Sequence, residues 1–278
     1  MKLRDITKIF EKQAKKKKRK IGIGILRPIP ETIQSLKKAQ KYADIVIVGA
    51  KVRGFENIIE GDSDQASKIL IKLLKDKKID GIVRGQVKDS YTFDEFHRQF
   101  NKKPLSSNRK LCPAILKKDK YTFVTSTASV YHALNFKDKV YEAEKIIEYI
   151  KKDLKIIPKI AVMGILRPTS KHGKYPILDE ISNRCKKLFR YLKKRGCDVK
   201  EYYMEYETAI WEGRNLIIPS VGFVGNSWLK SLIYLGGWEL MACPYLGLGV
   251  VYEDGSRNEK DFYWHTVHAV AMANKKFK

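Results

Sequence analysis

Short apolar segments that alternate with longer amphipathic segments constrain the fold of this chain more than any other feature. Apolar runs at 21–26, 45–49 and 81–83 are typical of buried strands, and helical patterns at 31–43 and 63–77 separate them. Parallel strands need a crossover connection, which is usually a helix, whereas a short turn joins antiparallel strands. The alternation therefore predicts an α/β fold in which these strands pair in parallel.

The same pattern restarts in the second half of the chain. It predicts strands at 121–124, 159–163 and 215–218, and helices at 139–152, 178–195, 226–235 and 261–275. An amphipathic helix at 1–20 precedes the first strand, and the polar stretch at 104–113 is the expected linker. With 278 residues, the chain is long enough for two such units with buried cores.

The basic composition leaves the partner of this protein open. The chain has 56 Lys and Arg against 31 Asp and Glu, a formal net charge of +25, and 43 of its cations are lysines. This balance fits nucleic-acid binding, but Lys-rich surfaces are also common in proteins that work at high temperature. The lysines are spread along helix faces and no standard nucleic-acid-binding motif is present, so nucleic acid is the least favoured partner.

Missing motifs disfavour several locations and chemistries. No apolar run approaches the ~20 residues of a transmembrane helix, and the first residues lack the apolar stretch of a signal peptide. We therefore expect a cytoplasmic protein with no membrane partner. The four cysteines form no CxxC pair and are expected to be buried small residues, so we predict no metal site. The absence of a P-loop, of a dinucleotide-binding glycine motif and of GxSxG disfavours the corresponding enzyme classes.

A five-residue sequence, GILRP, occurs twice in the chain. It begins at Gly24 and again at Gly164, 140 positions later, each time at or just after the end of a predicted strand. Because ligands bind at the carboxyl ends of the strands in open α/β sheets, the repeat places Arg27 and Arg167 at a ligand-binding edge. A chance match of common strand-ending residues is the alternative.

Four arginines near strand ends favour an anionic ligand. Arg84 and Arg257 join Arg27 and Arg167 in turns that follow predicted strands or contain Gly or Pro. A guanidinium group offers a planar pair of donors that matches phosphate or carboxylate. The four arginines therefore predict a phosphate-bearing ligand, although each one alone is equally well explained as a surface ion pair.

Two further segments add candidate ligand contacts. In segment 219–226, Gly225 allows close approach of a ligand to the backbone, and Asn226 is placed to cap the helix expected to begin there. A capped turn without a ligand explains this segment equally well. Ahead of the last helix, Ser256 is placed to donate to an anion that Arg257 clamps, but no nearby histidine activates the serine as a nucleophile. His265 and His268 share one helix face and, without a matching carboxylate motif, are expected to be packing or surface residues.

Taken in order, these motifs resemble the phosphotransacetylase/phosphotransbutyrylase superfamily. The likeness includes the DGIVRG segment and is clearest in a string made of Pro219, Gly225-Asn226, Lys230, Gly236-Gly237, Gly247-Leu248 and Ser256-Arg257. Within the superfamily, the paired GILRP segments and the GFVGNSWLKSL…LGGWELMACPYLGL run look most like the methanogenesis marker protein 4, or MtxX, family of methanogenic archaea. The likeness covers nearly the whole chain, more loosely in the middle, and that family is named for a methyltransferase subunit X.

The resemblance implies two α/β domains of the phosphotransacetylase type, which is also the isocitrate/isopropylmalate dehydrogenase-like type. The first would comprise residues 1–112 with 244–278 and the second residues 113–243, with the ligand in an interdomain cleft. It also implies a homodimer, corrinoid methyltransferase subunits as partners, and coenzyme A or another phosphate-bearing cofactor.

The match to the acyltransferase site is incomplete. Ser256 and Arg257 match the pair that binds and polarises acyl phosphate, and Gly225 and Asn226 match the family's Gly-Asn turn. The acyltransferases then have a catalytic acid, seven positions on, where this chain has a tyrosine. The resemblance leaves Asp261, five positions on, as the substitute acid, and that role requires a shifted turn.

Three functions remain open on this basis. The leading hypothesis is a transferase of methanogenic C1 metabolism, an MtxX-type subunit on a phosphate acyltransferase scaffold. Its anionic ligand would be neutralised by Arg27, Arg84, Arg167 and Arg257, while Ser256 and Asn226 orient the reacting group. An active phosphate acyltransferase and a non-catalytic subunit of a methyltransferase complex are the alternatives. The altered acid position, and an acidic Glu253-Asp254 pair that would repel a nearby phosphate, weigh against acyl transfer.

Overall fold

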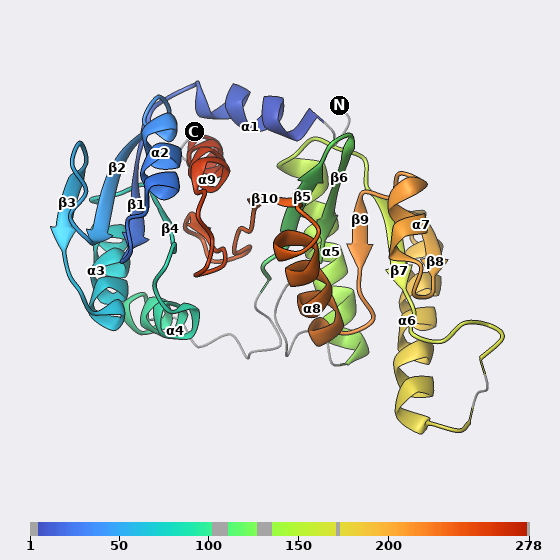
Figure 1. The fold of residues 1–278 in the computed structure, drawn as a ribbon. Helices are drawn as coiled ribbons and strands as arrows, with labels where there is room; N and C mark the ends of the chain where they lie inside the picture. Colours follow the sequence, from blue (N-terminus) through green and yellow to red (C-terminus); the bar gives the residue numbers. More distant parts are fainter. Residues whose placement is uncertain (1–4, 102–110, 127–134, 171–172, 277–278) are drawn as a thin grey trace. The chain divides into compact units, whose positions relative to one another are not determined.

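The chain forms two compact units, which we call the N/C unit and the middle unit. The structure, a computed structural model, describes residues 5–101, 111–126, 135–170 and 173–276 (Figure 1). The N/C unit comprises Thr7–Pro104 and Met241–Lys278, and the middle unit comprises Met1–Ile6 and Leu105–Leu240. The predicted domain boundaries after Cys112 and Cys243 stay a prediction. Most of the expected linker at 104–113 lies outside the described residues.

The N/C unit is built on a parallel sheet of five strands in the order β11-β4-β1-β2-β3. The strands are β1 (Arg19–Ile25), β2 (Ala43–Gly49), β3 (Glu56–Ile59), β4 (Gly81–Val83) and β11 (Tyr252–Glu253). β1, β2 and β4 are buried along most of their length, which explains their continuous apolar sequences. The predicted parallel pairing of these three strands is confirmed, whereas the half-exposed edge strand β3 has no comparable apolar run.

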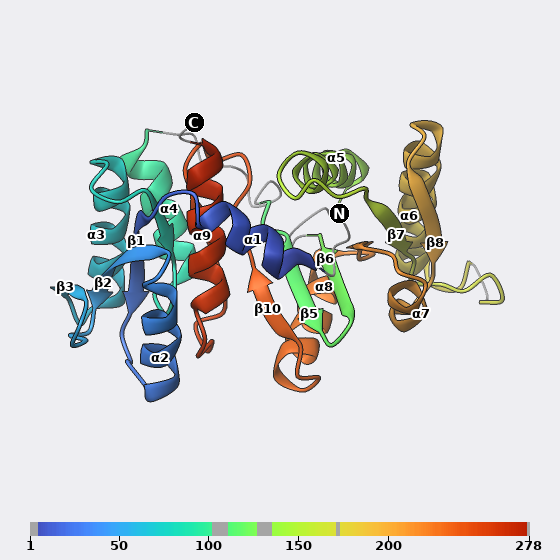
Figure 2. The same cartoon turned by 90° about the horizontal axis from the view of Figure 1, so that it is seen from above.

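Five helices belong to this unit among the described residues, and two of them connect strands of the sheet. The five are α1 (Ile6–Ala14), α2 (Pro30–Ala39), α3 (Ser63–Lys75), α4 (Asp89–Gln99) and α9 (Tyr263–Lys276), and the connections are α2 and α3. The crossover through α2 moves from β1 to β2, and the crossover through α3 returns past β1 to β4. Because parallel crossovers are right-handed, these opposite directions put the two helices on opposite faces of the sheet. α9 packs beside α2 and α4 beside α3, in agreement with that arrangement (Figure 2).

The middle unit carries a mixed sheet of six strands in the order β10-β5-β6-β9-β7-β8. The strands are β5 (Ala114–Lys118), β6 (Tyr121–Thr125), β7 (Lys159–Met163), β8 (Asp198–Tyr202), β9 (Leu216–Ile218) and β10 (Glu239–Ala242). β6, β9, β7 and β8 pair in parallel, but β5 and β6 are antiparallel. A turn at Asp119 and Lys120 is too short for a crossover, and the positive φ of Asp119, 51°, closes a hairpin instead.

The helices of the middle unit are α5 (Phe136–Lys152), α6 (Pro176–Lys194), α7 (Tyr206–Trp211) and α8 (Gly222–Tyr234). The expectation that Asn226 caps the helix after β9 is wrong, because α8 begins four residues earlier at Gly222. The N-cap residue is Val221, whose side chain makes no capping hydrogen bond. Across the described ranges of the chain, no helix combines the length and apolar character needed to cross a membrane.

Candidate anion-binding site

A pocket lies in the N/C unit where three neighbouring strands end. β1 and β11 both pair in parallel with β4, so the segments that follow them meet at one edge of the sheet. The pocket has a volume of about 460 Å³ and is lined by Leu26, Arg27, Ser63, Gln86, Lys88, Arg257 and Asn258. Two of the four arginines predicted to bind an anion therefore line one cavity, although they are 230 positions apart in the sequence.

Glycines allow the ends of β1 and β4 to approach closely. A Cβ atom on Gly24 would lie 2.6 Å from the carbonyl oxygen of Arg84. Gly85 has a φ of +65°, and a Cβ atom there would lie 2.1 Å from the carbonyl oxygen of Gly24. Only glycine fits both positions without moving the backbone. This close contact places the turn after β4 directly against the first GILRP segment.

Gln86 fixes the backbone that carries Arg27. Its Oε1 accepts hydrogen bonds from the amides of Leu26 and Arg27 at 2.9 and 2.6 Å, and its Nε2 donates to the Arg27 carbonyl oxygen at 3.1 Å. The Gln86 amide in turn donates to the carbonyl oxygen of Gly24 at 2.8 Å. A side chain that both accepts and donates is required for this set of bonds, which suits an amide. The sequence analysis did not single out Gln86, although it lies two residues after Arg84.

The guanidinium groups of Arg27 and Arg257 are exposed toward the pocket and carry uncompensated charge. Among the described residues, no acidic side chain pairs with either group. An ion pair between an exposed arginine and a carboxylate usually adds little to stability. Two arginines that line one cavity repel each other, and an anion bound between them removes this repulsion. The pair therefore favours binding of a phosphate or carboxylate group.

Lys88 and Ser63 also line the pocket, and neither was predicted from the sequence. The Lys88 ammonium lies 3.2 Å from the Asp64 carboxylate, and the Lys88 amide donates to the Ser63 hydroxyl at 3.0 Å. Lys88 is the N-cap residue of α4, and Ser63 is the first residue of α3. The lysine brings a third positive charge to the cavity, although one carboxylate already compensates part of it.

Arg84 supports the site from behind and does not line the pocket. Its buried guanidinium group donates to the Asp254 carboxylate and to the carbonyl oxygens of Gly85, Val87 and Gly255. Burial lowers the pKa of Arg84, but the charge and hydrogen bond of Asp254, together with the nearby Tyr252 and Asp89, outweigh burial and hold the pKa above its ordinary value. Because the Arg84 donors are bound to protein acceptors, two of them in the segment that leads to Arg257, Arg84 positions that segment.

Ser256 and Asp261 have structural contacts and are not among the residues that line the pocket. The half-buried Ser256 donates its amide to Glu259 Oε2 at 3.3 Å, and its hydroxyl accepts from the Asn258 amide at 3.3 Å. The exposed Asp261 carboxylate accepts from the Tyr263 amide at 2.7 Å, where α9 begins. Their predicted catalytic roles therefore stay predictions, and the structure gives each of them a turn or cap to hold.

The two acidic residues that precede Ser256 are neutralised inside the unit. Asp254 pairs with Arg84, and the fully buried Glu253 carboxylate contacts His268 Nδ1 and accepts from the Cys243 amide at 3.0 Å. Burial raises the pKa of Glu253, but the charges and hydrogen bonds of His268 and His265 outweigh it and leave the pKa below its usual range. Both carboxylates therefore have partners inside the unit, Arg84 for Asp254 and the two histidines for Glu253, and the expected repulsion of a phosphate stays a prediction.

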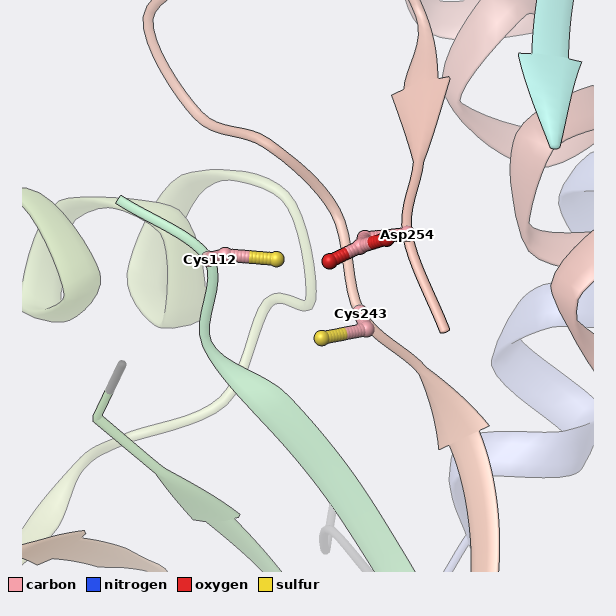
Figure 3. Close-up of side chains that lie close together, drawn as sticks. All are labelled: Cys112, Cys243 and Asp254. Atoms are coloured by element: carbon pink, nitrogen blue, oxygen red, sulfur yellow. The ribbon is translucent and has the colours of Figure 1, made fainter. Parts of the chain in front are cut away.

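Cys243 and Asp254 lie beside each other at the ends of β10 and β11 (Figure 3). The Cys243 sulfur and an Asp254 carboxylate oxygen are within 4.8 Å, and the Asp254 amide donates to the Cys243 carbonyl oxygen at 2.8 Å. The third side chain drawn in Figure 3, Cys112, belongs to the middle unit. Two ligand atoms are fewer than a structural metal site uses, and Asp254 already binds Arg84, so we assign no ion to this pair.

The remaining predicted site residues belong to the middle unit. Arg167 follows β7, as expected, and its exposed guanidinium group donates to Glu205 at 2.9 Å. Gly225 is buried and Asn226 is half-buried, both in the first turns of α8. That these three residues act in one site with Arg27 and Arg257 stays a prediction.

Solved structures define the class of fold. A phosphotransacetylase from Streptococcus pyogenes matches with a TM-score of 0.66 at 17% identity, over 99% of this chain and 100% of that chain. A branched-chain phosphotransacylase from Enterococcus faecalis gives 0.63 at 15% identity, over 92% and 99% of the two chains. A 4-hydroxythreonine-4-phosphate dehydrogenase from Klebsiella pneumoniae gives 0.52 at 11% identity, over 92% and 96%. The chain therefore has the phosphotransacetylase-like α/β fold that was predicted.

Curated relatives show a distant similarity to one particular group of proteins. The "Putative methyltransferase mtx subunit X" of Methanosarcina mazei is 27% identical over 256 residues, 89% of this chain and 88% of that protein. The protein of the same name from Methanosarcina barkeri is 25% identical over 253 residues, 88% and 90% of the two. No family model matches the chain. The chain is a distant homologue of these MtxX proteins, which confirms the resemblance found in its sequence.

Proposed function

We propose that this chain is an MtxX-type transferase subunit of methanogenic C1 metabolism that binds an anionic, phosphate-bearing ligand in the pocket of the N/C unit. The homology to methyltransferase mtx subunit X supports the first part. One observation carries the second: Arg27 and Arg257 line the same cavity, and within the described residues neither guanidinium group has a carboxylate partner. The interdomain cleft expected from the family stays a prediction.

The residues of the pocket would contribute to phosphate binding in different ways. Arg27 and Arg257 donate to its oxygens from two strand ends, and Lys88 adds a point charge. Gln86 keeps the Arg27 backbone in place and so reduces the entropy that is lost on binding. Preorganised donors of this kind are more effective than flexible ones because they need not rearrange when the ligand arrives.

Coenzyme A fits this pocket in part. Its phosphate groups match the three cations of the lining, and when bound it would supply a thiol for acyl transfer. Leu26 is the one aliphatic side chain among the lining residues, and no aromatic ring is among them to stack on adenine. The pocket thus suits the phosphate portion of such a cofactor.

A binding role without acyl transfer is favoured over an active phosphate acyltransferase. Tyr263 stands where the acyltransferases have an acid, and Asp261 holds the start of α9 with its carboxylate. The lining of the pocket contains no His, Glu, Asp or Cys that could act as general acid or base. Incubation with acetyl phosphate and coenzyme A should therefore give no acetyl-coenzyme A. Turnover that disappears in Arg257→Ala would establish acyl transfer instead.

Calorimetric titration of the full-length protein with coenzyme A and with inorganic phosphate tests ligand binding. Arg27→Ala and Arg257→Ala should each weaken binding about tenfold, the range expected for loss of a charge-assisted hydrogen bond. Arg53→Ala is the matched control, because Arg53 is exposed in the same unit and does not line the pocket. The proposal is wrong if neither ligand binds, or if the two pocket variants bind as tightly as Arg53→Ala.

A further inference from the structure

A chain of buried ionisable groups connects the core of the N/C unit to the turn that carries Arg257. On α9, His265 Nε2 lies 3.1 Å from Glu259 Oε1 and His265 Nδ1 lies 3.6 Å from Glu253 Oε2. The other oxygen of Glu259, Oε2, accepts from the Ser256 amide at 3.3 Å, and the Glu259 amide donates to the Ser256 carbonyl oxygen at 3.0 Å. The turn from Ser256 to Glu259 is thus closed by Glu259, and Glu259 is held by His265.

We propose that His265 is a positioning residue and that its imidazolium form, by bridging Glu253 and Glu259, holds the Ser256–Glu259 turn in the shape that presents Arg257 to the pocket. Anion binding would then weaken as pH rises and His265 loses its proton. The inference concerns the regulation of the site described above and rests on the proposed function.

The charge of the His265 ring depends on its number of protons. In the imidazolium form, Nε2–H donates to Glu259 at 3.1 Å, and Nδ1–H faces Glu253 at 3.6 Å, which is an ion pair beyond hydrogen-bond distance. A neutral imidazole keeps one N–H group and loses the positive charge that attracts both carboxylates. Glu253 is fully buried and also accepts from the Cys243 amide, so it stays in place. The Glu259 side chain is 13% exposed and can turn toward water. Loss of the proton removes the charge that attracts Glu259, so the remaining contact is weaker and the turn opens more readily.

The surroundings of His265 support a bridging cation. Its side chain is 1% exposed, and the two carboxylates approach it from β11 and from the loop before α9. His268, which is on α9 like His265, contacts the other oxygen of Glu253. On the side of β4, Arg84 donates to the Gly255 carbonyl oxygen and to Asp254. Burial lowers the pKa of His265, but Glu259 and Glu253 outweigh it and hold the pKa well above its ordinary value.

Close packing at Gly255 couples the ring to the turn. A Cβ atom on Gly255 would lie 2.8 Å from Glu259 Oε2 and 3.5 Å from His265 Cε1. The loop therefore has little room to shift while the Glu259–His265 contact is intact. When that contact breaks, the same proximity lets the movement of Glu259 reach Ser256 and Arg257 directly.

Hydrogen exchange of the full-length protein tests the positioning role without any ligand. Protection factors of the peptide that spans residues 254–259 should fall about tenfold in His265→Gln at pH 6, and in the wild type as pH rises through the raised pKa of His265. His97→Gln is the matched control, a buried histidine on α4 that does not touch the turn. Glu259→Gln, at a partly exposed side chain, should reproduce the loss even if His265→Gln fails to fold. Unchanged protection in both variants overturns the inference.

Sulfate binding separates this inference from the proposed function. Sulfate keeps its charge between pH 6 and pH 9, so a change in affinity reports on the protein. Wild-type affinity should fall severalfold over this range, while Glu259→Gln should bind weakly at every pH. If sulfate binds with an affinity that does not change with pH, the pocket stands and the role of His265 is wrong. If sulfate does not bind at all, the proposed function fails, and the exchange experiment still decides whether His265 holds the turn.

Discussion

Gln86 shows how a residue that need not touch the ligand controls the candidate site. Its side chain makes three hydrogen bonds to the backbone of Leu26 and Arg27. Gln86→Leu should lower the free energy of unfolding by about 1 kcal/mol, because it leaves partly buried backbone groups without their protein partner. Urea unfolding followed by circular dichroism measures this loss. An unfolding midpoint equal to that of the wild type would show that the Arg27 backbone is held by other contacts.

His265 gives the stability of the protein a defined pH dependence. Its pKa is raised in the folded state, so its favourable contacts are fully present below the ordinary histidine pKa of about 6.5 and are lost as pH rises through the raised value. The difference in free energy of unfolding between wild type and His265→Gln should be largest near pH 6 and should shrink toward pH 9. Urea unfolding at four pH values measures it. A difference that grows with pH would contradict this assignment.

At the scale of single residues, the sequence singled out two arginines that line the pocket, and it missed the residues that support them. Arg27 and Arg257 could be found because each follows a strand, and strand ends meet at one edge of a parallel sheet. Arg84 has the same kind of sequence context but points into the protein, since Asp254 and three carbonyl oxygens surround it. Gln86, Lys88 and Ser63 escaped prediction because their roles depend on which strands are neighbours in space.

At the scale of elements, continuous apolar runs predicted the central strands and missed those at the edges. β1 and β2 are buried almost throughout, whereas β3 has only exposed and half-buried residues, and β8 alternates exposed and half-buried residues before the buried Tyr202. Short edge strands lack a strong apolar signal because one side of each faces solvent. The predicted start of α8 is wrong for a different reason. Gly222 and Gly225 have low helix propensity, but packing overrides it and the helix includes both.

The N-terminus of α3 offers a test of local helix stability. The Asp62 carboxylate accepts from the amides of Asp64 and Gln65 at 2.9 and 2.8 Å. Asp62→Ala should lower the free energy of unfolding by about 1 kcal/mol, the usual value for loss of an N-cap. Asp76→Ala at the other end of the helix is the control and should be neutral or slightly stabilising, because a carboxylate there opposes the helix dipole. Thermal unfolding of both variants measures the difference, and equal melting temperatures would contradict a capping role.

At the scale of the whole molecule, hydrogen bonds connect the last helix, α9, to the first residues of the N/C unit. Asn274 accepts from Arg19 Nε at 2.7 Å and donates to the carbonyl oxygens of Gln13 and Lys17 at 3.0 and 2.9 Å. Asn274→Ala should lower the free energy of unfolding by about 2–3 kcal/mol, because several buried groups lose their partners. Asn183→Ala, on the exposed side of α6, is the matched control and should be neutral. If both variants unfold at the wild-type midpoint, the two ends of the unit are held by apolar packing alone.

Because β11 and α9 complete the first sheet, the order of synthesis does not match the order of assembly. The apolar strands β1, β2 and β4 leave the ribosome first, but the 136 residues from 105 to 240 must be made before their last partners follow. At ordinary rates of translation this delay is roughly 7 to 27 s. During that time the edge of β4 that later pairs with β11 is open. The half-built sheet therefore exposes this edge while the middle of the chain is being made, an exposure that a chain with contiguous units avoids.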